Sequence, residues 1–232
     1  FVRSSSVPGL QFEHVPGARE ILMGREILFN EFGHRGSPFH SLKPENERRI
    51  YFMGSSITLG WGVDQQECFS AVAGRLLNKE LSPKTNRSYV SINSGVSNFN
   101  TSHMAALYTR DIELVHPDAT IMQYFIRDVE PESSRDLSLL KFSYFAAFMY
   151  KQILGAISSG GKNIKEFYGD LYKDGNPNWE RTKNAILQIK KIASNLGTPF
   201  AVILIPDLRD PTIDGIFSEF YSTVKVFLKD SN

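Results

Sequence analysis

The chain has 232 residues, of which 41% are hydrophobic and 22% are charged, and its formal net charge at pH 7 is +1. This composition is typical of a globular protein with one substantial core, and the near-neutral charge gives no reason to expect a nucleic acid or an anionic membrane as a partner. Cys68 is the single cysteine, so the sequence cannot form an internal disulfide.

Residues 1–48 are predicted to form an extended, irregular arm laid over the rest of the chain. Prolines and glycines interrupt this stretch too often for long helices or strands. The remainder, residues 49–232, is predicted to be one α/β domain. The three histidines of the arm are expected to lie at the surface or to pack within the arm; they are His14, His34 and His40.

Four short apolar segments predict strands, and helical patterns separate them. The predicted strands are 49–53, 89–93, 119–125 and 200–205. The predicted helices cover 69–77, 101–116, 137–157, 178–196 and 213–228. Asn178 is expected to cap the helix at 178–196, and Gly197 is expected to end it. Strands that alternate with helices favour a parallel sheet covered on both faces, which is a three-layer α/β/α fold. The apolar stretch at 142–157 is too short and too interrupted by polar residues for a membrane-spanning helix.

Small polar residues follow three of the predicted strands. They occupy 54–56 (Gly-Ser-Ser), 93–95 (Asn-Ser-Gly) and 125–128 (Phe-Ile-Arg-Asp). The carboxyl ends of parallel strands meet at one edge of a sheet, which is where open α/β sheets bind their ligands. Acyl transfer needs a nucleophile and hydrogen-bond donors for the oxyanion. Ser56 is the candidate nucleophile, and the backbone N–H groups of Ser56 and Gly95 are the candidate donors, with Gly95 allowing close approach of a substrate oxygen.

Two plain structural interpretations stand beside this one. Ser56 could cap a helix, and Gly95 could form a simple turn. His103 lies in the first turn of a predicted helix and is expected at the surface, and His116 is expected to bond locally. The sequence has no zinc-helix spacing, and its near-matches to phosphate and dinucleotide loops lack required residues, so it predicts neither a metal nor a cofactor.

Taken together, these segments resemble the conserved blocks of the SGNH (GDSL-like) hydrolases. Residues 54–58 (Gly-Ser-Ser-Ile-Thr) resemble the first block, and 93–101 resemble the second. Residues 116–118 and 125–128 are similar to the approach and start of the third block. Upstream, 29–36 contains an Asn-x-x-Gly-x-Arg lead-in found in a bacterial branch of the family. The resemblance implies a flavodoxin-like SGNH fold, Ser56 as nucleophile and Gly95 in the oxyanion hole.

The chain also departs from the pattern of this family. Ser55 stands in place of an aspartate, Arg127 in place of the oxyanion-hole asparagine, and Asn98 in place of a glycine. A guanidinium can donate to an oxyanion, and Asp128 is a candidate partner for it. The family's Asp-x-x-His base is not found, because no histidine follows His116; that segment is expected beyond Asn232.

The resemblance implies a serine esterase or acyltransferase that acts on a small-molecule or carbohydrate ester, with a carbohydrate O-acetyl group as the expected substrate. Trp61, Asn98 and Asp128 are the candidate substrate-binding residues. Its extracytoplasmic bacterial members imply a location outside the cytoplasm. The alternative is a catalytically impaired SGNH-like module that binds a glycan or a protein partner, with Arg127 holding an anionic group.

Overall fold

We describe the fold from a computed structural model, which covers residues 1–131, 163–207, 215 and 217–231. The chain divides into two compact units. The first comprises Phe1–Asp128 and Arg181–Ile205, and the second comprises the described residues of Val129–Glu180 and Pro206–Asn232. The apolar helix predicted at 137–157 lies outside the described residues.

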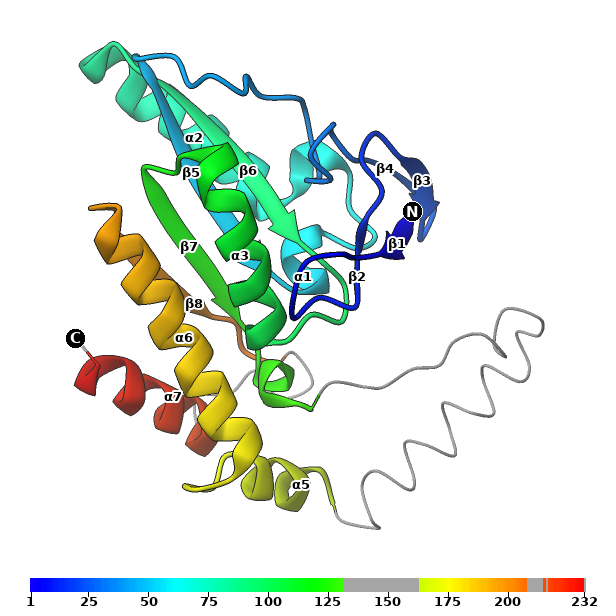
Figure 1. Cartoon of the computed structure of the whole chain (residues 1–232), viewed down its shortest axis with the longest axis vertical. Helices are drawn as coiled ribbons and strands as arrows, with labels where there is room; N and C mark the ends of the chain where they lie inside the picture. Colours follow the sequence, from blue (N-terminus) through cyan, green and yellow to red (C-terminus); the bar gives the residue numbers. More distant parts are fainter. Residues whose placement is uncertain (132–162, 208–214, 216, 232) are drawn as a thin grey trace. The chain divides into compact units, whose positions relative to one another are not determined.

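The first unit contains a four-stranded parallel sheet in the order β6-β5-β7-β8 (Figure 1). Its strands are β5 (Glu47–Gly54), β6 (Ser88–Gly95), β7 (Ala119–Tyr124) and β8 (Phe200–Leu204). All four predicted strands are therefore confirmed. Every residue of the two central strands, β5 and β7, is buried or half-buried, as is expected for strands covered on both faces.

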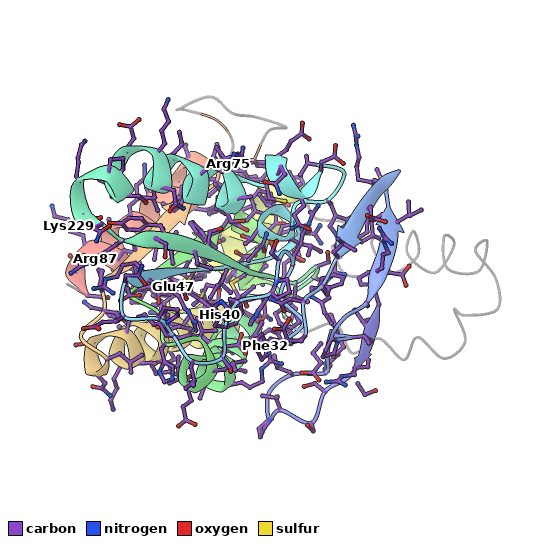
Figure 2. All side chains as sticks on the ribbon, turned by 90° about the horizontal axis from the view of Figure 1, so that it is seen from above. Phe32, His40, Glu47, Arg75, Arg87 and Lys229 are labelled. Carbon is purple, nitrogen blue, oxygen red and sulfur yellow. The ribbon has the colours of Figure 1, made fainter. Side chains whose placement is uncertain are left out.

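Helices cover both faces of this sheet. Seen from above, α2 (Phe69–Thr85) lies on one side of the strands and α3 (Thr101–Val115) lies on the other (Figure 2). Gly74 of α2 fits against β6, because a Cβ on this glycine would lie 2.9 Å from the Cβ of Ser91. The predicted α/β fold with a parallel sheet between helices is confirmed, and its carboxyl edge carries the candidate site.

The segment 1–48 is more regular than predicted. It forms two antiparallel hairpins, β1 (Val2–Ser4) with β2 (Phe12–His14) and β3 (Arg19–Leu22) with β4 (Arg25–Leu28). Met23 and Gly24 join β3 to β4 and both have positive φ, 55° and 75°. This geometry suits the right-handed twist of a tight hairpin, which a two-residue loop can close without interrupting the strands.

Among the described residues, the second unit is helical. Its helices are α5 (Ile164–Leu171), α7 (Ser218–Asp230) and the first turn of α6 (Pro177–Asn195), whose later residues belong to the first unit. Aromatic rings fill its interior, with centroid distances of 5.3 Å for Tyr172–Trp179 and 5.4 Å for Tyr172–Phe220. Within the described ranges no helix has the length and apolar character that a membrane crossing requires.

The start of α6 corrects one prediction. Asn178 was expected to cap this helix, but α6 begins at Pro177, and Asn176 Oδ1 accepts the Asn178 N–H at 2.9 Å. Proline favours the first helical position because its missing N–H has no intrahelical partner there. Gly197 ends the helix as predicted, with a φ of 65°.

Candidate functional site

Ser56 is the first residue of a single-turn helix, α1 (Ser56–Leu59), and a single residue, Ser55, separates it from the end of β5. The turn is sharp enough that Gly54 must be a glycine: a Cβ would lie 2.1 Å from Thr58 Oγ1 and 2.6 Å from Gln123 Oε1. Ser56 is half-buried. In the described part of the chain, neither its hydroxyl nor its N–H has a hydrogen-bond partner, so both can meet a ligand.

Gln123 holds this turn in place. Its side chain is fully buried near the end of β7, and its Oε1 accepts hydrogen bonds from Ser55 N–H at 3.3 Å and from the Thr58 hydroxyl at 3.1 Å. The two bonds hold the backbone of Ser55 and the side chain of Thr58, one on each side of Ser56. The sequence analysis missed this residue; the available signal was an amide side chain inside an otherwise buried strand, which must find partners there.

Gly95 ends β6 directly beside Gly54 in the parallel register. Its missing Cβ would lie 2.2 Å from Leu59 N and 2.6 Å from Thr58 C, so it is a glycine because α1 packs on it. The approach of a substrate oxygen, which was the reason predicted for this glycine, stays a prediction. Its N–H donates to Asn93 Oδ1 at 3.0 Å, while the amide nitrogen of Asn93 donates to Thr58 O at 2.7 Å.

Arg127 and Asp128 lie in η2 (Ile126–Val129), a short 3₁₀ turn just after β7. Arg127 is exposed and Asp128 is buried. Asp128 Oδ2 accepts the Phe125 N–H at 2.7 Å, and Asp128 O accepts the Thr101 hydroxyl at 3.3 Å, so this carboxylate stabilises the turn. Ser56, Gly95 and Arg127 thus follow the carboxyl ends of three neighbouring strands, as the sequence predicts from their order.

The other two candidate substrate-binding residues are exposed. Trp61 retains 45% of its surface, and its N–H bonds to Ser56 O at 3.3 Å, which places its backbone one turn beyond the candidate nucleophile. Asn98 has a φ of 64°, a left-handed conformation that asparagine tolerates better than most residues. That preference explains how asparagine can stand where the hydrolases that the sequence resembles have glycine.

His103, which was predicted at the surface, is buried, and so is His34, which was predicted to lie at the surface or to pack within the arm. His103 is buried because it belongs to the cap of α3: its ring Nδ1 accepts the Asn100 N–H at 3.3 Å, and Asn100 Oδ1 accepts the His103 N–H at 3.2 Å. His34 is buried because it meets Asp111 at 2.8 Å across the first unit. Among the described residues, no group of three or more histidine, cysteine or acidic side chains could hold a metal ion.

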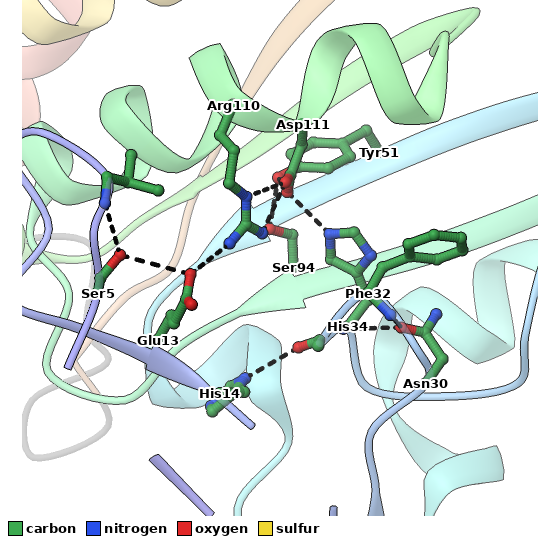
Figure 3. Close-up of polar contacts among 12 residues, drawn as sticks. Ser5, Glu13, His14, Asn30, Phe32, His34, Tyr51, Ser94, Arg110 and Asp111 are labelled. Atoms are coloured by element: carbon green, nitrogen blue, oxygen red, sulfur yellow. Dashed lines mark hydrogen bonds and ion pairs between the residues drawn. The ribbon is translucent and has the colours of Figure 1, made fainter. Parts of the chain in front are cut away.

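His34 is the first member of a buried polar network that extends to the carboxyl edge of the sheet (Figure 3). Asp111 Oδ2 accepts from His34 and from the Tyr51 hydroxyl at 2.6 Å, and Tyr51 meets Ser94 Oγ at 2.5 Å. Tyr51 has only one hydroxyl proton, which it gives to Asp111, so Ser94 must donate to Tyr51. Ser94 immediately precedes Gly95, so the network supports the second strand end of the site.

Electrostatics favour a protonated Tyr51 and an ionised Asp111 in this network. Burial and the neighbouring Asp111 carboxylate raise the pKa of Tyr51 well above its ordinary value, so its hydroxyl remains a donor. Burial alone would raise the pKa of Asp111, but His34, Arg110 and Tyr51 together hold it below its ordinary value. Arg110 continues the chain of contacts to Glu13 in β2, at 2.7 Å.

No family model matches the chain, and no curated protein matches it. The solved structures that are similar to it include the following three. TesA has 14% identity and a TM-score of 0.34, with 80% of this chain and 100% of that chain covered. LAE5, an alpha/beta hydrolase enzyme from the metagenome of Lake Arreo, Spain, has 16% identity and a TM-score of 0.30, covering 75% and 81%. A mutant of Axe2, an acetyl-xylooligosaccharide esterase from Geobacillus stearothermophilus, has 14% identity and a TM-score of 0.30, covering 69% and 77%. At these identities and TM-scores the matches assign neither a family nor an activity to this chain.

Proposed function

We propose that this chain is a serine esterase or acyltransferase of the SGNH type. The observation that carries the proposal is the Ser56 turn. Ser56 follows a central strand, Gln123 holds the residues on both sides of it, and its hydroxyl and N–H have no partner among the described residues. A nucleophilic serine has to be held rigidly in this way while its own hydroxyl stays available to the substrate.

In the proposed reaction, Ser56 Oγ attacks the carbonyl carbon of an ester and loses its proton to a base. The tetrahedral oxyanion accepts a hydrogen bond from the Ser56 N–H and a second one from the guanidinium of Arg127. The carbon–oxygen bond to the alcohol then breaks, the alcohol leaves with a proton, and an acyl-Ser56 intermediate remains. Water or a second alcohol accepts the acyl group. None of the histidines in the described residues makes a hydrogen bond to the Ser56 hydroxyl, so these residues do not identify the base.

The family resemblance supports a small acyl ester as the substrate, with a carbohydrate O-acetyl group as the leading candidate and an extracytoplasmic location. Trp61 and Asn98 are exposed on the segments that follow Ser56 and Gly95, where they can contact the alcohol portion of an ester. An exposed aromatic face and an exposed polar amide suit the mixed apolar and polar surface of a sugar.

Intact mass after treatment with a serine-reactive fluorophosphonate tests the nucleophile. We expect one adduct that disappears in Ser56→Ala and persists in Ser55→Ala, because the Ser55 hydroxyl is buried. Hydrolysis of p-nitrophenyl acetate should follow the same pattern. An adduct lost in Ser55→Ala instead would place the nucleophile at the neighbouring serine, and an adduct on neither would contradict the enzyme proposal.

A second function, a non-catalytic module that binds a glycan or a protein partner, is favoured by one specific observation. The Gly95 N–H already donates to Asn93 Oδ1, so the oxyanion hole lacks a donor unless this bond exchanges. If the parent protein shows no adduct and no turnover but binds acetylated oligosaccharides, and if Arg127→Met weakens that binding, the binding module replaces the esterase as the better proposal.

A further inference from the structure

A cavity of about 160 Å³ lies beside β6 in the first unit, away from the residues assigned to ester chemistry. Its walls come from the segment 35–38, from the start of α2 and from β6. Ser37 and Gln66 on its rim are exposed, so solutes can enter. A water molecule occupies about 30 Å³ in the liquid, so the cavity has room for several waters or for one small solute.

Arg35 brings a buried positive charge to this cavity. It is 4% exposed, and its two terminal nitrogens donate to three backbone carbonyls: Nη1 to Leu59 O and Gly60 O, both at 2.6 Å, and Nη2 to Val63 O at 2.8 Å. Its Nε–H has no acceptor among the described residues. Carbonyl oxygens satisfy hydrogen bonds, but they do not neutralise the charge.

No acidic side chain in the described part of the chain balances this charge by an ion pair. The cavity lining includes no aspartate or glutamate. Asp64 is close enough to act on Arg35 electrostatically, but it is half exposed and pairs with Arg25 at 3.0 Å. Cys68 also lines the cavity, and burial raises the pKa of its thiol, so it supplies no thiolate. A buried charge without a partner is costly, and an anion removes that cost.

We propose that this cavity binds a small oxyanion, of the size of phosphate, sulfate or acetate. Neutral donors complete the site: the Gln65 amide reaches the cavity beside Gly36, and Ser37 lines its rim. Because Arg35 also holds the carbonyls of Leu59, Gly60 and Val63, a bound anion stabilises the turn that follows Ser56. The anion is either a free tetrahedral ion or the carboxylate of a larger ligand.

Thermal unfolding and NMR test this site on the full chain. Sodium phosphate, sulfate and acetate are titrated against sodium chloride at equal ionic strength. We expect a saturable rise in Tm with an oxyanion and not with chloride, because ligands that bind only the folded state stabilise it. The Arg35 Nε–Hε resonance should shift along the same saturation curve. A response to phosphate and sulfate alone identifies a free tetrahedral ion, and a response to acetate identifies a carboxylate.

Two variants keep the test sharp. Ala71→Leu places a larger side chain in the cavity lining while Arg35 itself is kept, and it should abolish the saturable response. Arg87→Met removes an exposed arginine outside the lining, and it should leave the response unchanged. Arg35→Met is unsuitable alone, because it also releases three carbonyls. The proposal is overturned if no oxyanion exceeds chloride, or if Ala71→Leu responds like the parent protein.

Discussion

Because Gly95 has no side chain, α1 can pack closely against the end of β6. We predict that Gly95→Ala lowers the free energy of unfolding by about 2 kcal/mol or more, because the new Cβ meets backbone atoms of Thr58 and Leu59 that cannot move aside alone. Urea denaturation measures the effect. Gly169→Ala in α5 is the matched control: its Cβ meets nothing within 4 Å, so the change should be neutral or slightly stabilising.

A pH effect is expected from His14, whose ring lies 4.1 Å from the ring of Phe29 between centroids and donates from Nδ1 to Gly33 O. Burial lowers the pKa of His14 from 6.5 to about 4. Between these two values the unfolded chain binds a proton that the folded chain does not, so stability falls as pH decreases from 6.5 to 4. The full loss is about 3 kcal/mol, and no further loss from this residue follows below pH 4.

Urea denaturation between pH 7.5 and 4 checks this dependence. His14→Asn keeps a donor for Gly33 O but cannot titrate, so its stability should change less across the window. His40→Asn, at an exposed position, should keep the parent's slope. Equal slopes for the parent and for His14→Asn would contradict the assignment.

At this scale the sequence predicts where Ser56, Gly95 and Arg127 lie, because each follows a strand of one parallel sheet. It does not predict what each side chain or amide contacts. The Gly95 N–H bonds to Asn93, two residues earlier in the chain, and His34 meets Asp111, 77 residues later. Such pairings depend on the packing of several elements and leave no local pattern in the sequence.

Among the elements, the β5–α1 turn depends on β7 through Gln123. We predict that Gln123→Met, which keeps the shape of the side chain, lowers the free energy of unfolding by about 1–3 kcal/mol, since it leaves the Ser55 N–H and the Thr58 hydroxyl without their buried acceptor. We also expect Gln123→Met to lower the rate of fluorophosphonate labelling at Ser56.

The same substitution at an exposed position is the control for Gln123. Gln188→Met on α6 removes only a 3.3 Å bond to Thr109 and should change stability by less than about 0.5 kcal/mol. Gln123→Glu keeps an acceptor oxygen and should label faster than Gln123→Met. A labelling rate unaffected by Gln123→Met would show that Gln123 supports the fold without positioning Ser56.

Local patterns predict the elements of this chain better than their caps. Short apolar segments that are bounded by turn residues predict all four strands of the sheet, and helical spacing predicts α2, α3 and α6. The hairpins of the arm were missed because a strand of three or four residues is too short to show alternation. Asn178 was predicted as the cap because asparagine is a common cap residue. Asn176 is also an asparagine, and it is the one whose side chain accepts a backbone N–H of the first turn, so residue type alone could not distinguish the two.

For the molecule as a whole, the arm and the α/β part of the first unit are held together by buried charge. Asp111 accepts hydrogen bonds from His34 in the arm, from Tyr51 in β5 and from Arg110 in α3. We predict that Asp111→Asn costs about 3–5 kcal/mol of unfolding free energy, because it leaves buried partners unpaired. Since the folded-state pKa of Asp111 is lowered, its contribution is complete above the unfolded value of 3.8 and is lost as pH falls further.

Denaturation of Asp111→Asn at pH 7 measures this cost. Arg25→Met breaks the exposed pair with Asp64 and should cost less than about 1 kcal/mol, which separates the effect of burial from that of pairing. Similar losses in the two variants would mean that the network contributes no more than a surface ion pair. The division of the chain into an arm at 1–48 and a domain at 49–232 stays a prediction.

The burial of Cys68 gives this chain an internal measure of its own local opening. The thiol is 3% exposed and its pKa is raised, so a thiol reagent that is too large for the cavity it lines can react with it only after the junction between η1 (Gln65–Glu67) and α2 has separated transiently. Modification should therefore be at least about tenfold slower than for an unfolded control. Because the chain has no second cysteine, the rate of modification reports how often this junction opens. Any solute that stabilises the turn after Ser56, whose carbonyls Arg35 holds, should slow the modification.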